Sequence, residues 1–518
     1  MRWNIPGEPS TREAKLAARL KGGSKFFKFL WEIRGKLFTP EFQDELIEGF
    51  QRKRRDNVPP ALLAMVWLLQ AYTQASDRSA VDNATYDKRW QLVLGTLDTE
   101  GAPFGQGSLP RFRARLVRAD LDRRLVDRTV ELARETGLFG SRKLRGVLDS
   151  SPLRGAGRVE DTWNLIGRAM RNLVGALAKA NGVEADELIS KLELKTMGGS
   201  SLKATLDIDW TDENARVEAF QQLVDEANKL TGWIEKQQAR ADGPVLEALK
   251  DLSSVLDQDT EPDPDGVGTR IKRGVTKDRM PSLGDKEMRH GRKSKAFKFN
   301  GYKRFFMVIP GVRLVAGALA QPANVPEANA TGPLLDDLAR HGTVEGLDFD
   351  RGFLASPVIE DLRQRGVHVR CKPWRARNGK LFSKERFTLD LSAGTATCPA
   401  GNTVNIRTSK SGARKASWGQ ACLDCRLRSQ CTKAKRGRSV TVHPHEEFHQ
   451  ELRAEQATVE GRAALRERVV VEHALARLQL LQGSRARYKG TRKNTMDLRR
   501  YAALNNLYEV RRHVSRAA

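Results

Sequence analysis

The feature that most constrains the fold is an alternation of strand-like and helix-like runs between residues 302 and 371. Two strand-like runs, 302–309 and 312–319, are separated by Pro-Gly, which favours a hairpin. A helix, a strand, a second helix and a second strand are then predicted at residues 334–341, 344–350, 357–365 and 367–371. Such alternation is typical of an α/β layer with some parallel strand pairing.

The length of the chain predicts several domains. It has 518 residues, whereas a single domain has about 150. The first 145 residues or so consist of amphipathic, helix-like runs. A second helical stretch, 161–258, ends in an acidic, proline-containing linker, and we interpret it as a helical insertion after the first core strand.

The charge of the chain indicates a polyanionic partner. Lys and Arg number 90 against 64 Asp and Glu, so the formal net charge is +26. The longest apolar run, 59–72, is shorter than the ~18 residues expected of a membrane span, and the start lacks the apolar stretch of a signal peptide. We therefore expect a cytoplasmic protein with no membrane partner.

Three acids stand out by their positions. Asp149 ends the strand-like run KLRGVLD and precedes Ser-Ser-Pro, while Asp350 ends another run just before a glycine turn. Glu472 lies in a helical region, where positions 465, 469, 472 and 476 share one stripe and carry Leu, Val, Glu and Ala. An acid therefore interrupts a face that is otherwise apolar.

The three acids together favour a divalent-cation site. Burial of an unpaired carboxylate is costly, and a cation held with two further acids offsets that cost. The alternative for Glu472 is a buried ion pair with Arg468, one turn earlier. The alternative for acids at strand ends is that they are solvated turn residues.

Four ordered motifs resemble those of the DDE-type bacterial insertion-sequence transposases, which have an RNase H-like catalytic core. They are LDSSPLRGAG, DKEMRHGRKSKAFKFNGYK, DFDRGF and RERVVVEHALARLQLLQGSRARYKG. The segments PPALLAMVWLLQAY, SDRSAVDNATYDKRWQLVLG and SLPRFRARL are similar to the helical domain that precedes the core in one large group of these enzymes. The likeness covers most of the chain.

The resemblance implies that Asp149, Asp350 and Glu472 are catalytic and bind two Mg²⁺ ions, which Mn²⁺ can replace. Asp348 is the alternative to Asp350, although the Arg-Gly-Phe that follows favours Asp350. Two such metals can activate a nucleophile and stabilise a leaving group at a phosphodiester. The implied function is a DNA transposase that binds terminal inverted repeats, cleaves DNA strands as an endonuclease and transfers them.

The resemblance also implies an α/β fold with an RNase H-like mixed sheet. The predicted units are a helical DNA-end-binding domain (1–142), the first core strand (143–154) and the helical insertion with its linker (155–270). They are followed by the remaining core (271–378), a Cys-rich zinc-binding insertion (379–445), and the glutamate helix with basic carboxyl-terminal helices (446–518).

Four cysteines predict a structural zinc site. Cys398 lies in a knuckle-like CPAG turn, and CLDCRLRSQC supplies Cys422, Cys425 and Cys431. Four thiolates suit tetrahedral zinc, and the Cys-x-x-Cys pair is the specific part of the pattern. The alternatives are four reduced cysteines in a basic loop, or iron–sulfur ligation. Cys371 lies in a predicted strand and is expected in the core.

Basic and aromatic residues near the predicted site are candidates for DNA contacts. Some transposases of this class carry Tyr, Arg, Glu and Lys at fixed helical spacing around the glutamate. Only half of this motif is present here, because Arg468 occupies the Arg position but Leu465 and Gln479 occupy the Tyr and Lys positions. The predicted DNA-binding residues are Arg289, Arg292, Lys293, Lys303, Trp374, Arg468, Arg487, Tyr488 and Lys489. The basic runs could equally be solvated surface, and Trp374 could pack in the core instead of stacking on a base.

Base-specific recognition is expected from the arginine-bearing helices between residues 109 and 135, since a helix fits the major groove. Terminal repeats come in pairs, so we expect a homodimer or larger assembly on double-stranded DNA of the element ends and target, associated with the nucleoid. Two other functions are compatible with the sequence, a host-adopted DDE nuclease and a catalytically inactive DNA-binding regulator.

Overall fold

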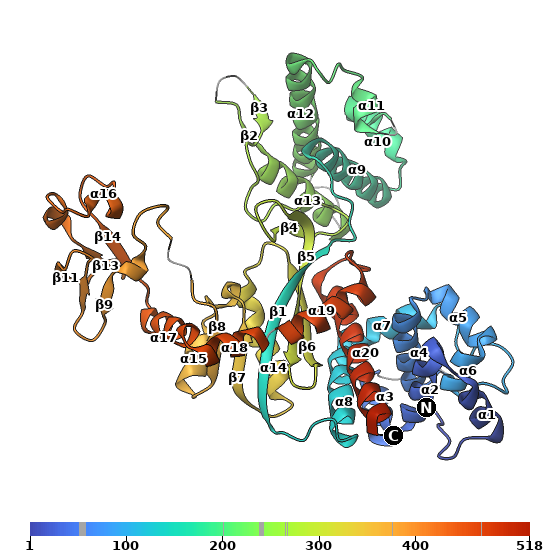
Figure 1. The fold of residues 1–518 in the computed structure, drawn as a ribbon. Helices are drawn as coiled ribbons and strands as arrows, with labels where there is room; N and C mark the ends of the chain where they lie inside the picture. Colours follow the sequence, from blue (N-terminus) through green and yellow to red (C-terminus); the bar gives the residue numbers. More distant parts are fainter. Residues whose placement is uncertain are drawn as a thin grey trace.

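The computed structural model describes all residues except 51–57, 200, 238–242, 265, 267, 375–376, 468 and 518. A central sheet carries three projecting parts, as Figure 1 shows. The amino-terminal helices lie on one side, the helical insertion extends from one end of the sheet, and a Cys-rich lobe stands apart on the opposite side. Both chain ends lie beside the amino-terminal helices.

The central sheet is mixed, with β1 in its middle. Its strands are β1 (Lys143–Arg154), β4 (Arg289–Arg292), β5 (Lys298–Ile309), β6 (Leu314–Pro322), β7 (Thr343–Phe349) and β8 (His368–Cys371). β1 pairs antiparallel with β5 and parallel with β7, β7 pairs parallel with β8, and β5 pairs antiparallel with β4 and β6. The predicted hairpin is thus confirmed, as are the two predicted helices, α14 (Thr331–Ala339) and α15 (Val358–Gln364).

The prediction that β1 stops at Asp149 is wrong. The strand continues through Ser150, Ser151 and Pro152 to Arg154, because β5 pairs with it along this whole stretch. The parallel partner β7 ends earlier, at the pair Val147 and Asp348. Beyond that point β1 lacks its neighbour on the β7 side, and a proline without an N–H is tolerated on such an open edge.

The amino-terminal helices form one core with the sheet. They are α1 (Thr11–Arg19), α2 (Lys25–Leu37), α3 (Pro40–Gly49), α4 (Pro60–Thr73), α5 (Asp77–Tyr86), α6 (Lys88–Leu94), α7 (Ser108–Ala119) and α8 (Leu121–Glu135). Every residue of α4 from Ala61 to Ala71 is buried, as is typical of a helix that is apolar on all sides. The same cluster of buried residues includes Val147 of β1 and Phe306 of β5. These helices are therefore packed on the core as part of it.

Helix α20 (Thr491–Ala517) joins these two parts, because it packs on β6 and also against α8 and α4. β6 is an edge strand, and polar side chains of α20 satisfy its outward backbone groups. The side chain of Asn506 accepts from the Val315 N–H at 2.7 Å and donates to the Val315 carbonyl at 2.9 Å. Thr495 Oγ1 accepts from the Ala320 N–H at 3.0 Å. An open sheet edge is thereby covered.

A buried ion-pair network fastens α20 to the start of α8. The carboxylate of Asp122, which is fully buried, accepts from Arg492 at 2.5 Å and from Arg499 at 3.0 Å. Asp120 pairs with the same two arginines, at 3.2 Å and 2.7 Å. Charges this deeply buried are tolerated only while each keeps its partner.

The helical insertion has a hydrophobic core of its own. Its helices are α9 (Thr162–Asn181), α10 (Ala185–Lys191), α11 (Leu202–Leu206), α12 (Glu213–Gln237) and α13 (Gly243–Asp259). The stretch predicted to be only a linker instead contains a two-stranded ribbon, β2 (Thr260–Pro262) and β3 (Thr269–Ile271). The buried carboxylate of Asp259 pairs with Arg279 at 2.6 Å and accepts from Thr162 at 3.0 Å, so the ribbon is joined to the base of α9.

The remaining elements belong to the Cys-rich lobe and to the carboxyl-terminal part. The lobe contains two small antiparallel sheets, one of β9 (Thr388–Asp390), β10 (Thr395–Thr397) and β11 (Thr403–Asn405), the other of β12 (Arg407–Thr408), β13 (Arg414–Ser417) and β14 (Ser439–Val442), with the short α16 (Arg428–Cys431). It is followed by α17 (Glu446–Ala457), α18 (Val459–Glu467) and α19 (Val469–Gln482).

We predict that Asp122→Ala lowers the free energy of unfolding by about 1.5–3 kcal/mol, because Arg492 and Arg499 lose their buried partner and keep only the half-exposed Asp120. Asp98→Ala is the control, since Asp98 pairs with Arg12 at the surface, and it should cost less than about 1 kcal/mol. Both values can be measured by urea unfolding of the full chain. Equal effects of the two substitutions would contradict a structural role for the buried network.

Candidate functional site

The register of β1 and β7 places Asp149 and Asp350 side by side. The last parallel pair is Val147 with Asp348. Asp149 lies two residues further along β1, and Asp350, whose backbone is still extended, lies two residues further along the chain, just past the end of β7. Side chains two residues apart in a strand point to the same face, so Asp149 and Asp350 lie on the face that carries Val147. Both residues are half-buried. They lie at the point where β7 ends and β1 continues with β5 as its remaining partner.

Asp348 has a different role from Asp350. It is buried and forms a two-point ion pair with Arg145 of β1, with Nε to Oδ2 at 2.8 Å. Arg370 of β8 lies 3.8 Å from the same carboxylate. The carboxylate of Asp348 is therefore used to hold three strands together, and Asp350 is the more accessible of the two.

Glu472 lies on α19, but not in the buried stripe that the sequence predicted. The buried side of α19 consists of Val471, Ala474, Leu475, Leu478 and Gln482. Val469, Glu472 and Ala476 are exposed, so the predicted apolar stripe is the outer side of the helix. The assignment was wrong because the side of α19 that carries Val471, Leu475 and Leu478 packs on the sheet and turns Glu472 outward. The predicted ion-pair partner, Arg468, lies outside the described residues.

α19 covers the face of the sheet on which the two aspartates lie. Val471, Leu475 and Leu478 belong to the same buried cluster as Val147 and Phe306. Phe306 is the antiparallel partner of Asp149 across β1 and β5, and partners in register share a face. The helix that carries Glu472 thus lies against the strands that carry Asp149.

Arg304 and Gln74, which the sequence analysis did not single out, hold the end of α19. The buried guanidinium of Arg304 on β5 donates to Gln482 Oε1 at 2.6 Å, to the Gly483 carbonyl at 2.9 Å and to Ser151 Oγ at 2.8 Å. Burial lowers the pKa of Arg304 to about 10. Gln74 of the amino-terminal part donates to the Leu481 carbonyl at 2.9 Å. A cation at a helix carboxyl terminus is stabilising.

Glu327 is a further acid near the aspartates that the sequence analysis missed. It begins the short 3-10 helix η3 (Glu327–Ala330) after β6, and its Oε1 accepts from Ser150 Oγ at 2.7 Å. A Cβ placed on Gly352 would overlap the Oε2 of Glu327. Glu327 therefore lies between the neighbour of Asp149 and the turn after Asp350. Its position shortly after a strand is the sequence signal that could have identified it.

Metal-ligand geometry is absent from the described part of the chain. No group of three or more His, Cys, Asp or Glu side chains among those residues is arranged to hold a metal ion. Asp149 and Asp350 thus lie at adjacent positions, whereas Glu472 is exposed on a helix that packs on the same face, and the three carboxylates do not form a closed ligand set. The same holds for the four cysteines of the lobe.

The four cysteines nevertheless converge on one small cavity of about 20 Å³. Cys398, Cys422, Cys425 and Cys431 all line it, and all are free thiols. Burial raises the pKa of the Cys431 thiol; Arg438 opposes this, and the other three cysteines raise the pKa further. Cys371 is buried in β8, as predicted.

The residues predicted to contact DNA fall into two groups. Arg289 and Lys303 are half-buried and donate to backbone carbonyls, and the Tyr488 ring is half-buried beneath Arg113. These three have structural contacts within the protein. The exposed ones are Arg292, Lys293, Trp374, Arg487 and Lys489.

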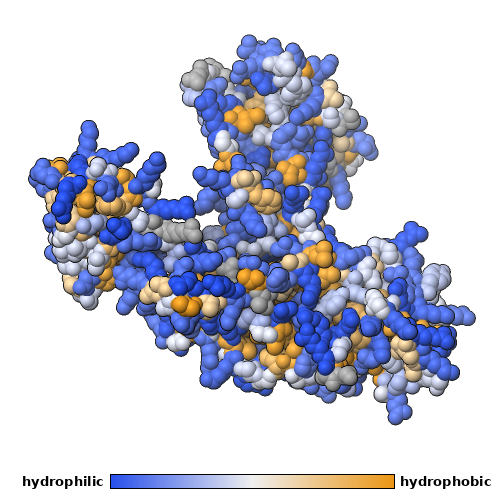
Figure 2. All heavy atoms as spheres, viewed as in Figure 1, coloured by the Kyte–Doolittle hydropathy of each residue, from blue (hydrophilic) through white to orange (hydrophobic). Residues whose placement is uncertain are grey.

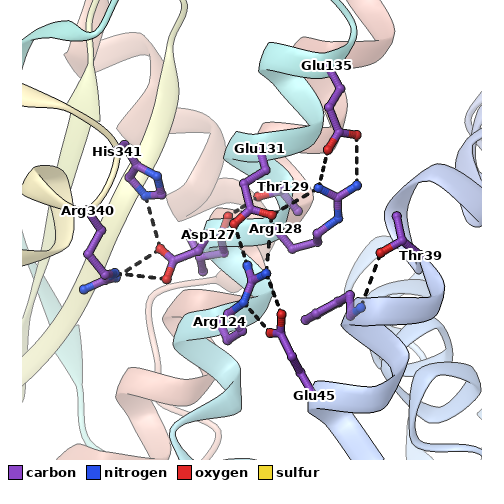
Figure 3. A network of polar contacts seen from close by, with 12 residues as sticks. Thr39, Glu45, Arg124, Asp127, Arg128, Thr129, Glu131, Glu135, Arg340 and His341 are labelled. Atoms are coloured by element: carbon purple, nitrogen blue, oxygen red, sulfur yellow. Dashed lines mark hydrogen bonds and ion pairs between the residues drawn. The ribbon is translucent and has the colours of Figure 1, made fainter.

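Most arginines of α8 are engaged in ion pairs within the protein. Figure 3 shows Arg124 between Glu45 and Glu131, and Arg128 between Glu131 and Glu135. On the other side of α8, Arg340 and His341 bind Asp127 at 3.0 and 3.1 Å.

These contacts join α8 to α3 and to the end of α14, so α8 is an internal connector of the fold. Base recognition by the helices between residues 109 and 135 stays a prediction. On α7, Arg111 and Arg118 remain exposed.

Comparison with known proteins adds one finding. Residues 397–511 match a family model described as a transposase DDE domain. The matched range contains the four cysteines of the lobe, Glu472 and most of α20, and it supports a DDE-type transposase. No similar protein of curated function and no similar solved structure was found. Within the described residues, no helix has both the length and the apolar character needed to cross a membrane.

We predict that Gly352→Ala destabilises the protein by about 0.5–1.5 kcal/mol, because the Glu327 side chain must leave its present rotamer to make room for the added methyl. In a Glu327→Ala background the same substitution should cost at least about 0.5 kcal/mol less, since the overlapping carboxylate is gone. Gly311→Ala is the control, because no atom lies near its Cβ position. Urea unfolding of the single and double variants measures the coupling, and strictly additive effects would refute the contact.

Proposed function

We infer that this DDE-type transposase cleaves DNA phosphodiesters with Asp149, Asp350 and Glu472. The observation that carries this proposal is the register of β1 and β7, which brings Asp149 and Asp350 to adjacent positions at the end of their shared ladder. α19, with Glu472 in its first turn, packs on the same face. The match to a transposase DDE domain includes Glu472.

The order of the strands supports an RNase H-like core. From one edge the sheet contains β6, β5, β1, β7 and β8, with the first three antiparallel and the last three parallel. Function in such a fold depends on the site that it carries, so the activity of this chain depends on its acids.

The three acids offer only oxygen ligands, which suits Mg²⁺ or Mn²⁺. Bound divalent cations would activate the attacking hydroxyl and stabilise the leaving oxygen of the phosphodiester. Asp149 and Asp350 would hold these cations from the sheet, and Glu472 from α19. Asp348 is the less suitable ligand, because Arg145 already occupies its carboxylate.

Arg304 and Gln74 would act as positioning residues in this site. They hold the carboxyl-terminal end of α19 to β5 and to the amino-terminal part, respectively. The position of α19 on the sheet, and with it the position of Glu472, would therefore depend on contacts made at the far end of the helix.

The proposed substrate is double-stranded DNA at the ends of the element and at the target, bound by two or more copies of the chain. A host-adopted DDE nuclease would use the same acids but would not join the cut strand to a target. An inactive regulator would bind DNA without cutting it. Mapping of cut and joined products, with and without Mg²⁺, separates these functions.

We also propose that the four cysteines of the lobe bind one structural zinc. The convergence of all four on one cavity of about 20 Å³ supports this, because a cavity of that size accommodates a single small species. Four thiolates are a common ligand set for structural zinc. Zinc would hold the CPAG turn to the segment from Cys422 to Cys431 and so complete a lobe with a small hydrophobic core.

We predict that Asp149→Asn, Asp350→Asn and Glu472→Gln each lower the rate of Mg²⁺-dependent strand cleavage by more than about a hundredfold, since loss of even the outer partners of a metal ligand costs 10- to 100-fold. Glu467→Gln is the control, because Glu467 is exposed on the preceding helix. DNA binding by all four variants should be retained. Wild-type cleavage by Asp350→Asn would transfer its role to Asp348, and wild-type cleavage by all variants would refute the proposed site.

We predict about one zinc per chain by elemental analysis of the purified protein. Cys422→Ser and Cys425→Ser should lose the metal and lower the melting temperature, because the lobe loses its cross-link. Cys371→Ala should keep the metal, since Cys371 lies in β8 outside the lobe. A wild-type protein that is free of zinc and whose melting temperature does not respond to a chelator would contradict this proposal.

A further inference from the structure

A cavity of about 500 Å³ opens where the helical insertion meets the core. Four parts of the chain line it: the segment that follows β1, helices α9 and α11 of the insertion, the segment between β3 and β4, and the loop between α19 and α20. Its charged lining residues are Arg158, Glu160, Arg168, Arg171 and Lys489. The cavity is thus shared between the insertion and the core.

Positive charge dominates this lining. Glu160 is the one acid among the lining residues; it is buried and its carboxylate binds Arg168 Nη1 at 3.2 Å. A Cβ added to Gly284 would lie 3.7 Å from Nη2 of Arg168 and 3.6 Å from Nζ of Lys489. Two cations therefore approach each other over a glycine, an arrangement that an anion would stabilise.

Hydrogen bonds hold the walls of the cavity in place. The N–H of Gly490, next to Lys489, donates to the buried Asp285 carboxylate and to the Tyr302 hydroxyl, both at 3.0 Å. The Ala486 N–H donates to the Arg154 carbonyl at 2.7 Å, which ties the same loop to the end of β1. Lys489 is therefore presented by a fixed backbone, a form of preorganisation.

Backbone contacts also tie the insertion side to the core. The N–H of Glu160 donates to the carbonyl of Pro281 at 3.0 Å. The guanidinium of Arg485 donates to the carbonyls of Gly155 and Ala156, both at 3.3 Å. These contacts hold the two sides of the cavity in fixed positions at the junction of the insertion and the core.

We propose that this cavity binds a backbone phosphate of the DNA substrate, so that the helical insertion and the core clamp one strand together. The proposal rests on the proposed function and extends it to a second point of contact. The chain runs seven residues from Asp149 to Ala156 in an extended or nearly extended form. The distance between these two residues is therefore at most about 23 Å, at ~3.3 Å per residue. That length corresponds to about seven base pairs of duplex.

The phosphate could come from DNA or from a free anion, and the structure favours DNA. Arg158 and Lys489 are exposed at the cavity, and Arg154 and Arg487, which lie within four residues of them in the chain, are exposed as well. Figure 2 shows hydrophilic side chains over most of the visible face of the molecule. A linear polyanion fits this distribution better than a single small anion does.

The test measures binding of the full chain to an element-end duplex across a salt series, without divalent metal. Arg158→Ala and Lys489→Ala should each make the negative slope of log K against log salt shallower, by about 0.9 for each phosphate that the variant no longer neutralises. Lys250→Ala is the control, because Lys250 is exposed on α13 and does not line the cavity. Arg168 is left intact, since its removal would leave the buried Glu160 without its partner.

A second measurement locates the bound phosphate. A single neutral methylphosphonate is placed at successive positions on either side of the mapped cut. It should weaken wild-type binding most at a position that lies about seven base pairs or fewer from the cut. The same modified duplex should bind to the Lys489→Ala variant as tightly as the unmodified duplex does. Unchanged salt slopes in both variants, with normal DNA binding by the wild type, would overturn the clamp while leaving the proposed function intact.

An anion other than DNA is distinguished by inorganic phosphate. If millimolar phosphate raises the melting temperature of the wild type but not that of Lys489→Ala, while the DNA salt slopes of the two proteins agree, the cavity is a free-anion site and the proposal fails. A wild-type protein that binds no DNA at any salt concentration would instead refute the proposed function itself.

Discussion

The open edge of β6 is the constraint on which the rest of the fold depends. An uncovered edge strand leaves backbone donors and acceptors without partners and invites pairing with another chain. Here α20 covers that edge, and Asn506 and Thr495 bind the backbone of Val315 and Ala320. Because these are side-chain contacts to specific backbone groups, the position of α20 along β6 is specified.

The position of α20 determines where the amino-terminal helices lie. Asp122 at the start of α8 pairs with Arg492 and Arg499 of α20, and the apolar side of α4 completes the shared core. The amino-terminal part is therefore built on the last helix of the chain, and not on a flexible tether. Gln74 extends this dependence to α19, which carries Glu472.

The arginines of this basic chain have two distinct uses. Those of α8 neutralise carboxylates inside the protein and connect the amino-terminal part to the core (Figure 3). Those at the junction of the insertion and the core outnumber the acids around them and face a cavity. A high net charge therefore identifies the class of partner, whereas the pairing of each arginine decides which surface can meet it.

The sequence by itself determined the α/β alternation, the helical insertion and the hairpin of β5 and β6, because these follow from local periodicity and turn residues. Only the tertiary structure decided that β1 continues past Asp149, since β5 pairs with it there. Only the structure could show that Glu472 lies on the outer side of α19, because helix phase depends on which side finds a partner. The ion pairs of α8 likewise join residues far apart in the sequence, and no local pattern encodes such contacts.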